Sequence, residues 1–185
     1  MMTKDLVLTV ISDDKPGVVE TLAQTIAAHG GNWSESQLSH LAGKFAGILR
    51  VSASEENVAQ LRRALDDLQT QSIKVVAEPA GTSAGRPPCR HYTFTALGND
   101  RPGIVREIAQ ALSSRQINME HLSTEYSSMP WSGEPLFSAT GSLQVPTSVD
   151  IDDLTEQLDT IADELAIDIA LEEPQHAQEP SREHN

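Results

Sequence analysis

Two copies of a short motif, Asp-x-Pro-Gly followed fifteen residues after its glycine by Asn, carry the side chains that could bind a small polar molecule. Each motif opens a helical pattern, and the N–H groups at a helix N-terminus attract a carboxylate. The glycine would let a ligand approach the backbone, the aspartate could pair with an ammonium group, and the asparagine offers both donor and acceptor. The candidate ligand-binding residues are Asp14, Gly17 and Asn32 in the first copy and Asp100, Gly103 and Asn118 in the second.

A purely structural interpretation of the same residues stays open. An aspartate before Pro-Gly is a good N-cap, because its carboxylate can accept a hydrogen bond from the N–H of Gly17 or Gly103. Glycine at a helix start can be required for close packing alone, and asparagine after Gly30 and Gly31 can close a turn. The pairing of aspartate with a downstream asparagine in both copies favours a binding site.

The motif belongs to a longer repeat. Residues 8–32 and 94–118 are identical at eight of 25 positions, 86 residues apart, and most other positions exchange within a chemical class. The similarity resumes at offsets of 94 and 93, with Gly47 matched to Gly141, which places one insertion of eight residues within Ser127–Pro135. A period this long exceeds a solenoid repeat and fits a small domain, so we predict two tandem copies of one fold.

The patterning predicts the same order of elements in each copy: strand, helix, two strands, helix, strand. The first copy begins with a strand over Leu6–Ile11 and a helix from Pro16 to Gly30-Gly31, whose apolar stripe is Val18, Val19, Leu22 and Ile26. A hairpin of Trp33–Leu41 and Phe45–Ala53 around Ala42-Gly43 follows. The copy ends with a helix whose stripe is Val58, Leu61, Leu65 and Leu68 and a strand over Ile73–Ala77. In the second copy they are His91–Gly98, Pro102–Arg115, Asn118–Tyr126, Leu136–Val145, Ile151–Leu165 and Ile167–Leu171. Right-handed crossovers then predict an α+β, ferredoxin-like βαββαβ fold, with a four-stranded antiparallel sheet and both helices on one face.

Composition predicts the domain boundaries. The first domain spans 1–79, a Pro/Gly/Ser-rich linker spans 80–90, and the second domain spans 91–173. A disordered acidic tail is predicted at 174–185, because this stretch is polar and proline-bearing. Open sheets leave edge strands that tend to pair, either between the two domains or between two chains in a homodimer.

Charge and motif content exclude several classes of function. The formal net charge of −14 repels a phosphate backbone, so we expect no direct contact with nucleic acid. A base-stacking RNA module of the same topology would need aromatic side chains on its sheet, which the central strands lack. We find no P-loop, nucleophile–base grouping or metal-ligand spacing, and therefore expect no enzyme activity, no metal and no cofactor.

The remaining features place the protein and its surface. No apolar segment approaches membrane-spanning length, so we expect a cytoplasmic protein without membrane association. The single cysteine, Cys89, excludes an intrachain disulfide and suits a reducing compartment. Trp131, in the inserted loop, could anchor a contact or pack on its own domain. We expect His40, His121 and Tyr126 to lie at the surface or in an interface.

The repeated motif, its downstream asparagine and the βαββαβ order resemble the ACT domain, a family of small-molecule regulatory modules, over nearly all of the chain outside linker and tail. Two such domains without a catalytic or DNA-binding domain resemble the glycine cleavage system transcriptional repressor family. In amino-acid-binding ACT domains, residues at the aspartate and asparagine positions contact the ligand, commonly across an interface between two domains. The first of these positions is often asparagine in such members, and aspartate keeps the acceptor but loses the donor.

The resemblance implies a ligand-responsive regulator that acts through a protein partner. The implied effector is a small molecule such as the amino acid glycine, and the implied partner is a DNA-binding transcription factor that controls amino-acid or one-carbon metabolism genes. A second interpretation is an amino-acid-sensing module that regulates a metabolic enzyme in trans. Both share every sequence feature, and the identity of the bound partner would separate them.

Overall fold

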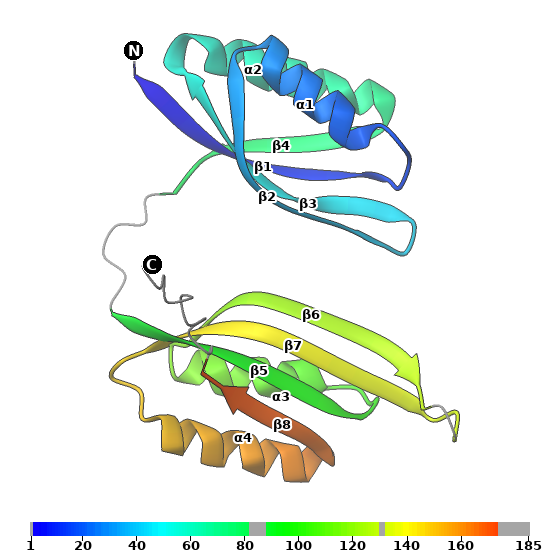
Figure 1. Ribbon diagram of the computed structural model, residues 1–185, viewed down its shortest axis with the longest axis vertical. Coiled ribbons are helices and arrows are strands. Elements are labelled where there is room, and N and C mark those ends of the chain that lie inside the picture. Colours follow the sequence, from blue (N-terminus) through cyan, green and yellow to red (C-terminus); the bar gives the residue numbers. More distant parts are fainter. Residues whose placement is uncertain (1, 82–87, 130–131, 174–185) are drawn as a thin grey trace, which may run out of the picture. The chain divides into compact units, whose positions relative to one another are not determined.

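The chain divides into two compact units, residues 1–84 and 85–185. The computed structural model describes residues 2–81, 88–129 and 132–173 (Figure 1). The predicted tail 174–185, the central part of the predicted linker and Trp131 lie outside these described residues.

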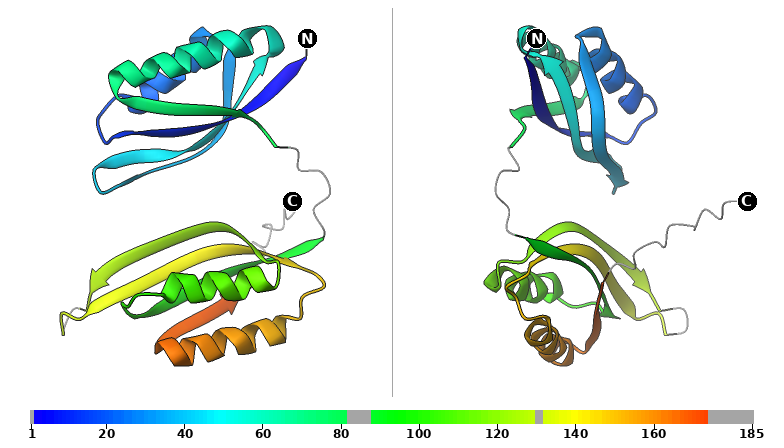
Figure 2. Two further views of the ribbon diagram at one scale, coloured as in Figure 1. Left: turned by 180° about the vertical axis from the view of Figure 1, so that it is seen from behind. Right: turned by 60° about the vertical axis from the view of Figure 1, so that its left-hand side comes forward.

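The first unit has the predicted order of elements. These are β1 (Thr3–Asp13), α1 (Val18–Ala28), β2 (Gly31–Leu41), β3 (Lys44–Ser54), α2 (Glu55–Asp67), the 3-10 turn η1 (Leu68–Gln71) and β4 (Ile73–Pro79). The strands form one antiparallel sheet in the order β2-β3-β1-β4. Both helices cover the same face of the sheet (Figure 2), which leaves the other face open.

The second unit repeats this architecture. Its elements are β5 (Cys89–Asn99), α3 (Ile104–Ser114), β6 (Asn118–Ser128), β7 (Pro135–Pro146), α4 (Ile151–Leu165) and β8 (Ile167–Glu172). The sheet order is β6-β7-β5-β8, again antiparallel with the helices on one face. The α+β, ferredoxin-like fold predicted for both copies is therefore confirmed. Because β5 begins at Cys89, the second copy starts two residues before the predicted strand.

Each unit has its own apolar core between sheet and helices. In β1, Leu6, Leu8 and Val10 alternate toward the helices, as the period of two in a half-buried strand requires. In α1 the buried side chains are spaced by four residues, Val18, Leu22 and Ile26. Val19 was predicted to belong to this stripe, but it is 47% exposed, because one further residue turns the side chain by about 100° away from the core. The buried stripe of α2 includes Leu61 and Leu65, as predicted.

The β2–β3 hairpin has the predicted two-residue turn. Ala42 (φ 50°) and Gly43 (φ 76°) both lie in the left-handed region, as a type I′ turn requires. A type I′ turn matches the twist of the two strands it joins. The hairpin of the second unit is longer, and Asp100 N donates to Pro135 O at its base (3.0 Å).

The strand register corrects the predicted insertion. Asn32 pairs with Ser52, and Asn118 pairs with Gln144, so the third strands are related by an offset of 92 rather than 94. Two residues lie between the paired Leu41 and Lys44, whereas eight lie between their counterparts. The hairpin insertion is therefore six residues, and the offset reaches 94 only at β8. The counterpart of Gly141 is Leu49, not Gly47.

Candidate ligand-binding site

Each motif forms the turn between the first strand and the first helix of its unit. Gly17 (φ 92°) and Gly103 (φ 106°) occupy the N-cap positions of α1 and α3 in left-handed conformation. Their carbonyl groups accept the first helical hydrogen bonds, from Thr21 N (2.9 Å) and Glu107 N (3.0 Å). The helices thus begin two residues after the prolines that were predicted to open them.

Neither aspartate of the motif caps its helix. No side chain makes a cap hydrogen bond at the start of α1 or α3, so the predicted alternative of an aspartate N-cap is wrong. Asp14 and Asp100 are exposed, and in the part of the chain that the structure describes their carboxylates have no hydrogen bond or ion pair. The first-turn N–H groups consequently have no side-chain acceptor among the described residues, and this arrangement favours a bound anion.

The space in front of the motif glycines is open. A Cβ atom added to Gly17 would meet nothing within 4 Å, and one added to Gly103 would meet only Arg106 Nη2, at 3.7 Å. Close packing therefore does not explain these glycines, whereas their positive φ does. A small molecule can approach the backbone at both positions without displacing a side chain.

The loops are fixed to the rest of their units by equivalent contacts. The N–H of Asp14 donates to Gly43 O (3.0 Å), which ties the loop to the β2–β3 turn. Lys15 Nζ donates to Gln71 O (2.9 Å), and Arg101 Nη2 donates to Glu164 O (2.5 Å). In each unit a cation thus contacts a carbonyl at the end of the second helical segment, where the helix dipole is negative. The sequence signal for this contact was a basic residue at the same motif position in both copies.

We expect Lys15→Met to lower the free energy of unfolding of the first unit by up to about 1 kcal/mol, because a charge-assisted hydrogen bond to a helix end is lost at an exposed site. Urea denaturation monitored by Trp33 fluorescence measures this change. Lys74→Met is the matched control, because Lys74 has no hydrogen bond or ion pair within residues 2–81. Equal stability of the two variants would show that the contact with Gln71 does not hold the loop.

The structure does not bring the two ends of either motif together within one unit. Asn32 pairs with Ser52 of β3, which in turn pairs with Asp5 of β1. Asp14 follows the far end of β1, nine residues beyond Asp5, which corresponds to roughly 30 Å of strand. The same register separates Asn118 from Asp100. A ligand that contacted both residue types would therefore need a second copy of the domain.

The ionisable residue next to the first motif is engaged in an ion pair. Lys44 Nζ lies 2.5 Å from Asp13 Oδ1, and this hydrogen bond and the positive charge of Lys44 lower the pKa of Asp13. Asp13 therefore holds the end of the hairpin, while the neighbouring Asp14 keeps its carboxylate free.

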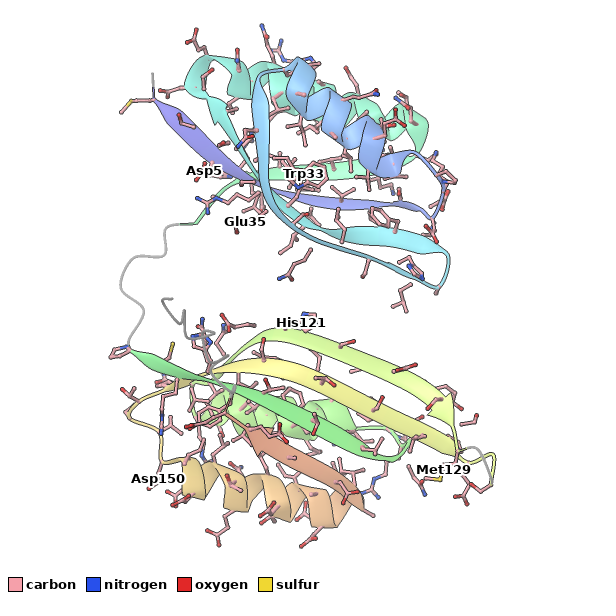
Figure 3. The ribbon with its side chains drawn as sticks, viewed as in Figure 1. Asp5, Trp33, Glu35, His121, Met129 and Asp150 are labelled. Atoms are coloured by element: carbon pink, nitrogen blue, oxygen red, sulfur yellow. The ribbon has the colours of Figure 1, made fainter. Side chains whose placement is uncertain are left out.

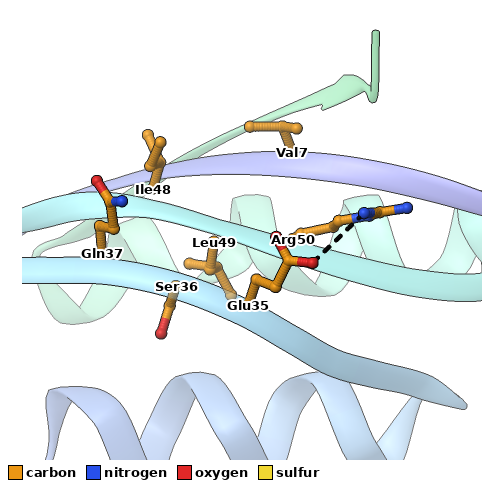
Figure 4. A pocket seen from close by; sticks show the side chains of 7 residues that line it. All are labelled: Val7, Glu35, Ser36, Gln37, Ile48, Leu49 and Arg50. Carbon is orange, nitrogen blue, oxygen red and sulfur yellow. Dashed lines mark ion pairs between the residues drawn. The ribbon is translucent and has the colours of Figure 1, made fainter. Parts of the chain in front are cut away.

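A cavity of about 560 Å³ lies away from the motif loops, on the open face of the first sheet (Figure 4). It adjoins the β-bulge between Trp33 and Glu35, two residues labelled in Figure 3. Glu35 and its cross-strand partner Arg50 form an ion pair in the lining of this cavity, with Arg50 Nη1 at 3.5 Å from Glu35 Oε1. The lining residues are Val7, Glu35, Ser36, Gln37, Ile48, Leu49 and Arg50.

The other residues singled out from the sequence lie at the surface. His40 and His121 are exposed, and Tyr126 is 67% exposed, so their placement was predicted correctly. Cys89 is a free thiol at the start of β5. Among the described residues, no cluster of His, Cys, Asp or Glu could hold a metal ion. None of the described helices is both long and apolar enough to cross a membrane.

Comparison with known proteins identifies the fold family. The family model of the ACT domain matches residues 4–78. The first unit is an ACT domain. The second unit repeats the strand order of the first, its glycine at the helix N-cap and its bulge in the second strand, so both units have the same ferredoxin-like fold.

Several known proteins are similar to this chain. The glycine cleavage system transcriptional repressor of Escherichia coli K12 is 22% identical over 118 residues, and the match covers 63% of this chain and 62% of the repressor. The chain thus spans about six tenths of the length of the curated relatives it matches. A protein of unknown function from Galdieria sulphuraria superimposes with a TM-score of 0.83 at 26% identity, over 93% of this chain and 99% of its own. A structure provisionally assigned to a glycine cleavage system transcriptional repressor superimposes with a TM-score of 0.68 at 20% identity. The match covers 92% of this chain and 97% of that structure, and it shows the fold alone.

Proposed function

We propose that this protein is a ligand-responsive regulator that controls transcription of amino-acid or one-carbon metabolism genes of the glycine cleavage type. It acts in the cytoplasm through contact with a DNA-binding protein and has no catalytic activity of its own. The observation that carries the proposal is the helix N-terminus that both units share. It has no side-chain cap hydrogen bond, and the space in front of Gly17 and Gly103 is open. The similarity to the glycine cleavage repressor supports the regulatory role. The net charge of −14 supports a protein partner rather than direct DNA binding.

The proposed effector is an amino acid. Its carboxylate would accept hydrogen bonds from the first-turn N–H groups of α1 or α3, beside Gly17 or Gly103. The free carboxylate of Asp14 or Asp100 would pair with its ammonium group, because neither has a cation partner among the described residues. The asparagine would complete the site from another copy of the domain, since within one unit it is roughly 30 Å away.

The β2 edge gives a physical route to such a complete site. The N–H of Asp14 is bonded to Gly43, so the motif loop lies at the C-terminal end of β2, while Asn32 lies at its N-terminal end. Antiparallel pairing of the β2 edges of two chains would therefore place Asn32 of each chain near the Asp14 loop of the other. A ligand bound there would contact both chains and stabilise the homodimer, which would change the affinity for the regulated partner.

We expect glycine or another amino acid to raise the melting temperature of the full chain and to give a saturable heat in calorimetry. Asn32→Ala and Asn118→Ala should each weaken this response, and the double variant should abolish it. Asn57→Ala is the matched control, because Asn57 lies on α2 and outside both motifs. An absence of heat and of thermal shift with every amino acid would reduce the protein to a ligand-independent adaptor. Affinity purification that yields a metabolic enzyme and no transcription factor would overturn the proposed partner.

A further inference from the structure

A second cavity lies in the first domain, at the end of the sheet where β1 begins and β4 ends. Its volume is about 620 Å³, and residues of β1, β3, α2 and the segment after β4 line it. Three basic side chains reach it, Lys4, Arg50 and Arg62, together with apolar walls that include Leu6, Val58 and Pro79. No residue of either ligand-binding motif contributes to this cavity.

Two of the three cations are neutralised by ion pairs. Lys4 Nζ lies 2.5 Å from Glu55 Oε1, and Arg50 Nη2 lies 2.5 Å from Asp5 Oδ2. The hydrogen bond and negative charge of Asp5 raise the pKa of Arg50, as expected for a paired guanidinium. Asp5 is also the only acidic residue among the described residues that line the cavity. Arg50 Nη1 also pairs with Glu35, at 3.5 Å. Arg62 is the one of these three cations that has no ion pair within the described residues.

Arg62 has no partner in the part of the chain that the structure describes. It forms no ion pair or hydrogen bond there, and its Nε is shielded from solvent without an acceptor. A shielded donor without an acceptor costs free energy, and a guanidinium cannot relieve this cost by losing its proton. The residue as a whole is half-buried, and its planar fork suits an anion with two oxygens.

The second domain has no counterpart of this group. Leu61 corresponds to Leu154 in the repeat, so the position of Arg62 corresponds to Thr155. The Thr155 hydroxyl donates to Ile151 O within its own helix (2.9 Å). The cation at this helix position is therefore a property of the first domain. In the second domain the Nε of Arg90 is also shielded without an acceptor, but its guanidinium donates to Val149 O and lies over the Tyr92 ring.

We propose that the first domain binds a small aliphatic carboxylate in this cavity, with Arg62 as the group that recognises the carboxylate. The guanidinium supplies parallel N–H donors, and the walls of Leu6, Val58 and Pro79 accept a short apolar chain. In a chain with a net charge of −14, this cavity offers an anion a guanidinium that has no ion pair within the described residues. The site is separate from the motif loops.

The test uses the full chain, sodium butyrate as probe and sodium chloride at equal ionic strength as reference. We expect butyrate to shift the Arg62 Nε–Hε resonance saturably in NMR titrations and to raise the melting temperature. Arg62→Gln should abolish both effects, and Arg62→Lys should weaken binding about tenfold, because it keeps the charge but loses the fork. Arg63→Gln is the matched control, because this adjacent side chain is exposed and does not line the cavity.

The outcomes separate this site from the amino-acid site. The Asn32→Ala/Asn118→Ala double variant should keep the full butyrate response, even if no amino acid binds at the motif loops. An equal butyrate response in Arg62→Gln and Arg63→Gln would overturn the proposal. Binding of inorganic phosphate without binding of butyrate would overturn the assignment to a carboxylate. If Arg62→Gln does not fold, Arg62→Lys and the direct shift of the Nε–Hε resonance still decide.

Discussion

Replacing Gly141 with leucine should lower the free energy of unfolding of the second domain by about 3 kcal/mol, the upper part of the range for overpacked cores. A Cβ atom at this position would lie 2.8 Å from His121 O and 2.9 Å from Phe94 Cδ1, and closer still to Phe94 Cε1. Phe94 pairs directly with Gly141 across the sheet and is 2% exposed, so its ring cannot move toward solvent. Denaturation by urea, with hydrogen exchange to locate the change, measures the effect.

The first domain shows how the clash could be relieved. The pair that corresponds to Phe94 and Gly141 is Leu8 and Leu49, two buried side chains in direct cross-strand pairing. The first domain thus has two leucines where the second domain pairs a large phenylalanine with a glycine, which has no side chain. Phe94→Leu combined with Gly141→Leu should therefore recover about 1–3 kcal/mol relative to additive effects of the single variants.

Thr140→Leu is the control for added volume on the same strand. Thr140 is exposed, so the change in stability should stay within about 0.5 kcal/mol. If Gly141→Leu is as stable as Thr140→Leu, or if the two single changes are additive, the proposed exchange between ring and glycine is wrong.

The same glycine shows where sequence alone was insufficient. The sequence comparison matched Gly141 with Gly47, because both are glycines. The strand register shows that the counterpart of Gly141 is Leu49. Sequence similarity cannot place a gap inside a hairpin, because alternate residues of a strand repeat the same apolar pattern every two positions. Hydrogen bonds between strands decide the register, and they depend on the neighbouring strand.

The fold itself was predictable because several local signals agreed. Alternation in the strands, spacing of four in the helices and the Ala42-Gly43 turn all indicate the same topology. The exposure of Val19 was missed, although its counterpart Val105 is also exposed at 42%. Both valines directly follow a buried residue of the helix, and the sequence alone does not show which of two adjacent apolar residues faces the core.

The residues of the candidate site stay a prediction, but their separation within one unit follows from the predicted topology. The topology alone implies that the end of one strand and the start of the next parallel strand lie at opposite ends of a sheet. The roughly 30 Å between Asp14 and Asn32 could therefore have been inferred. The lack of an ion-pair partner for Arg62 could not have been inferred. Arg62 and Arg63 are adjacent residues of identical type on one helix, and only coordinates distinguish their surroundings.

Replacing Gly17 or Gly103 with valine should lower the free energy of unfolding of the corresponding domain by about 1–3 kcal/mol. Both glycines have φ near 100°, where a β-branched side chain is strained. The cost is conformational, because the added atoms would meet no close neighbour at either position. Gly17→Asn should cost less than Gly17→Val, since asparagine tolerates the left-handed region.

This comparison separates two roles of the motif glycine. If the glycine served packing, asparagine and valine would be about equally harmful, because both add a Cβ and further atoms. If it serves backbone conformation, only valine should disturb the first turn of α1, and hydrogen exchange of the Val18 and Val19 amides would accelerate in that variant alone. Under the proposed function, valine also removes the N–H groups from the position where the carboxylate binds, so Gly17→Val and Gly103→Val together should abolish the amino-acid response. Gly17→Asn should reduce it less, because its first helical turn is retained.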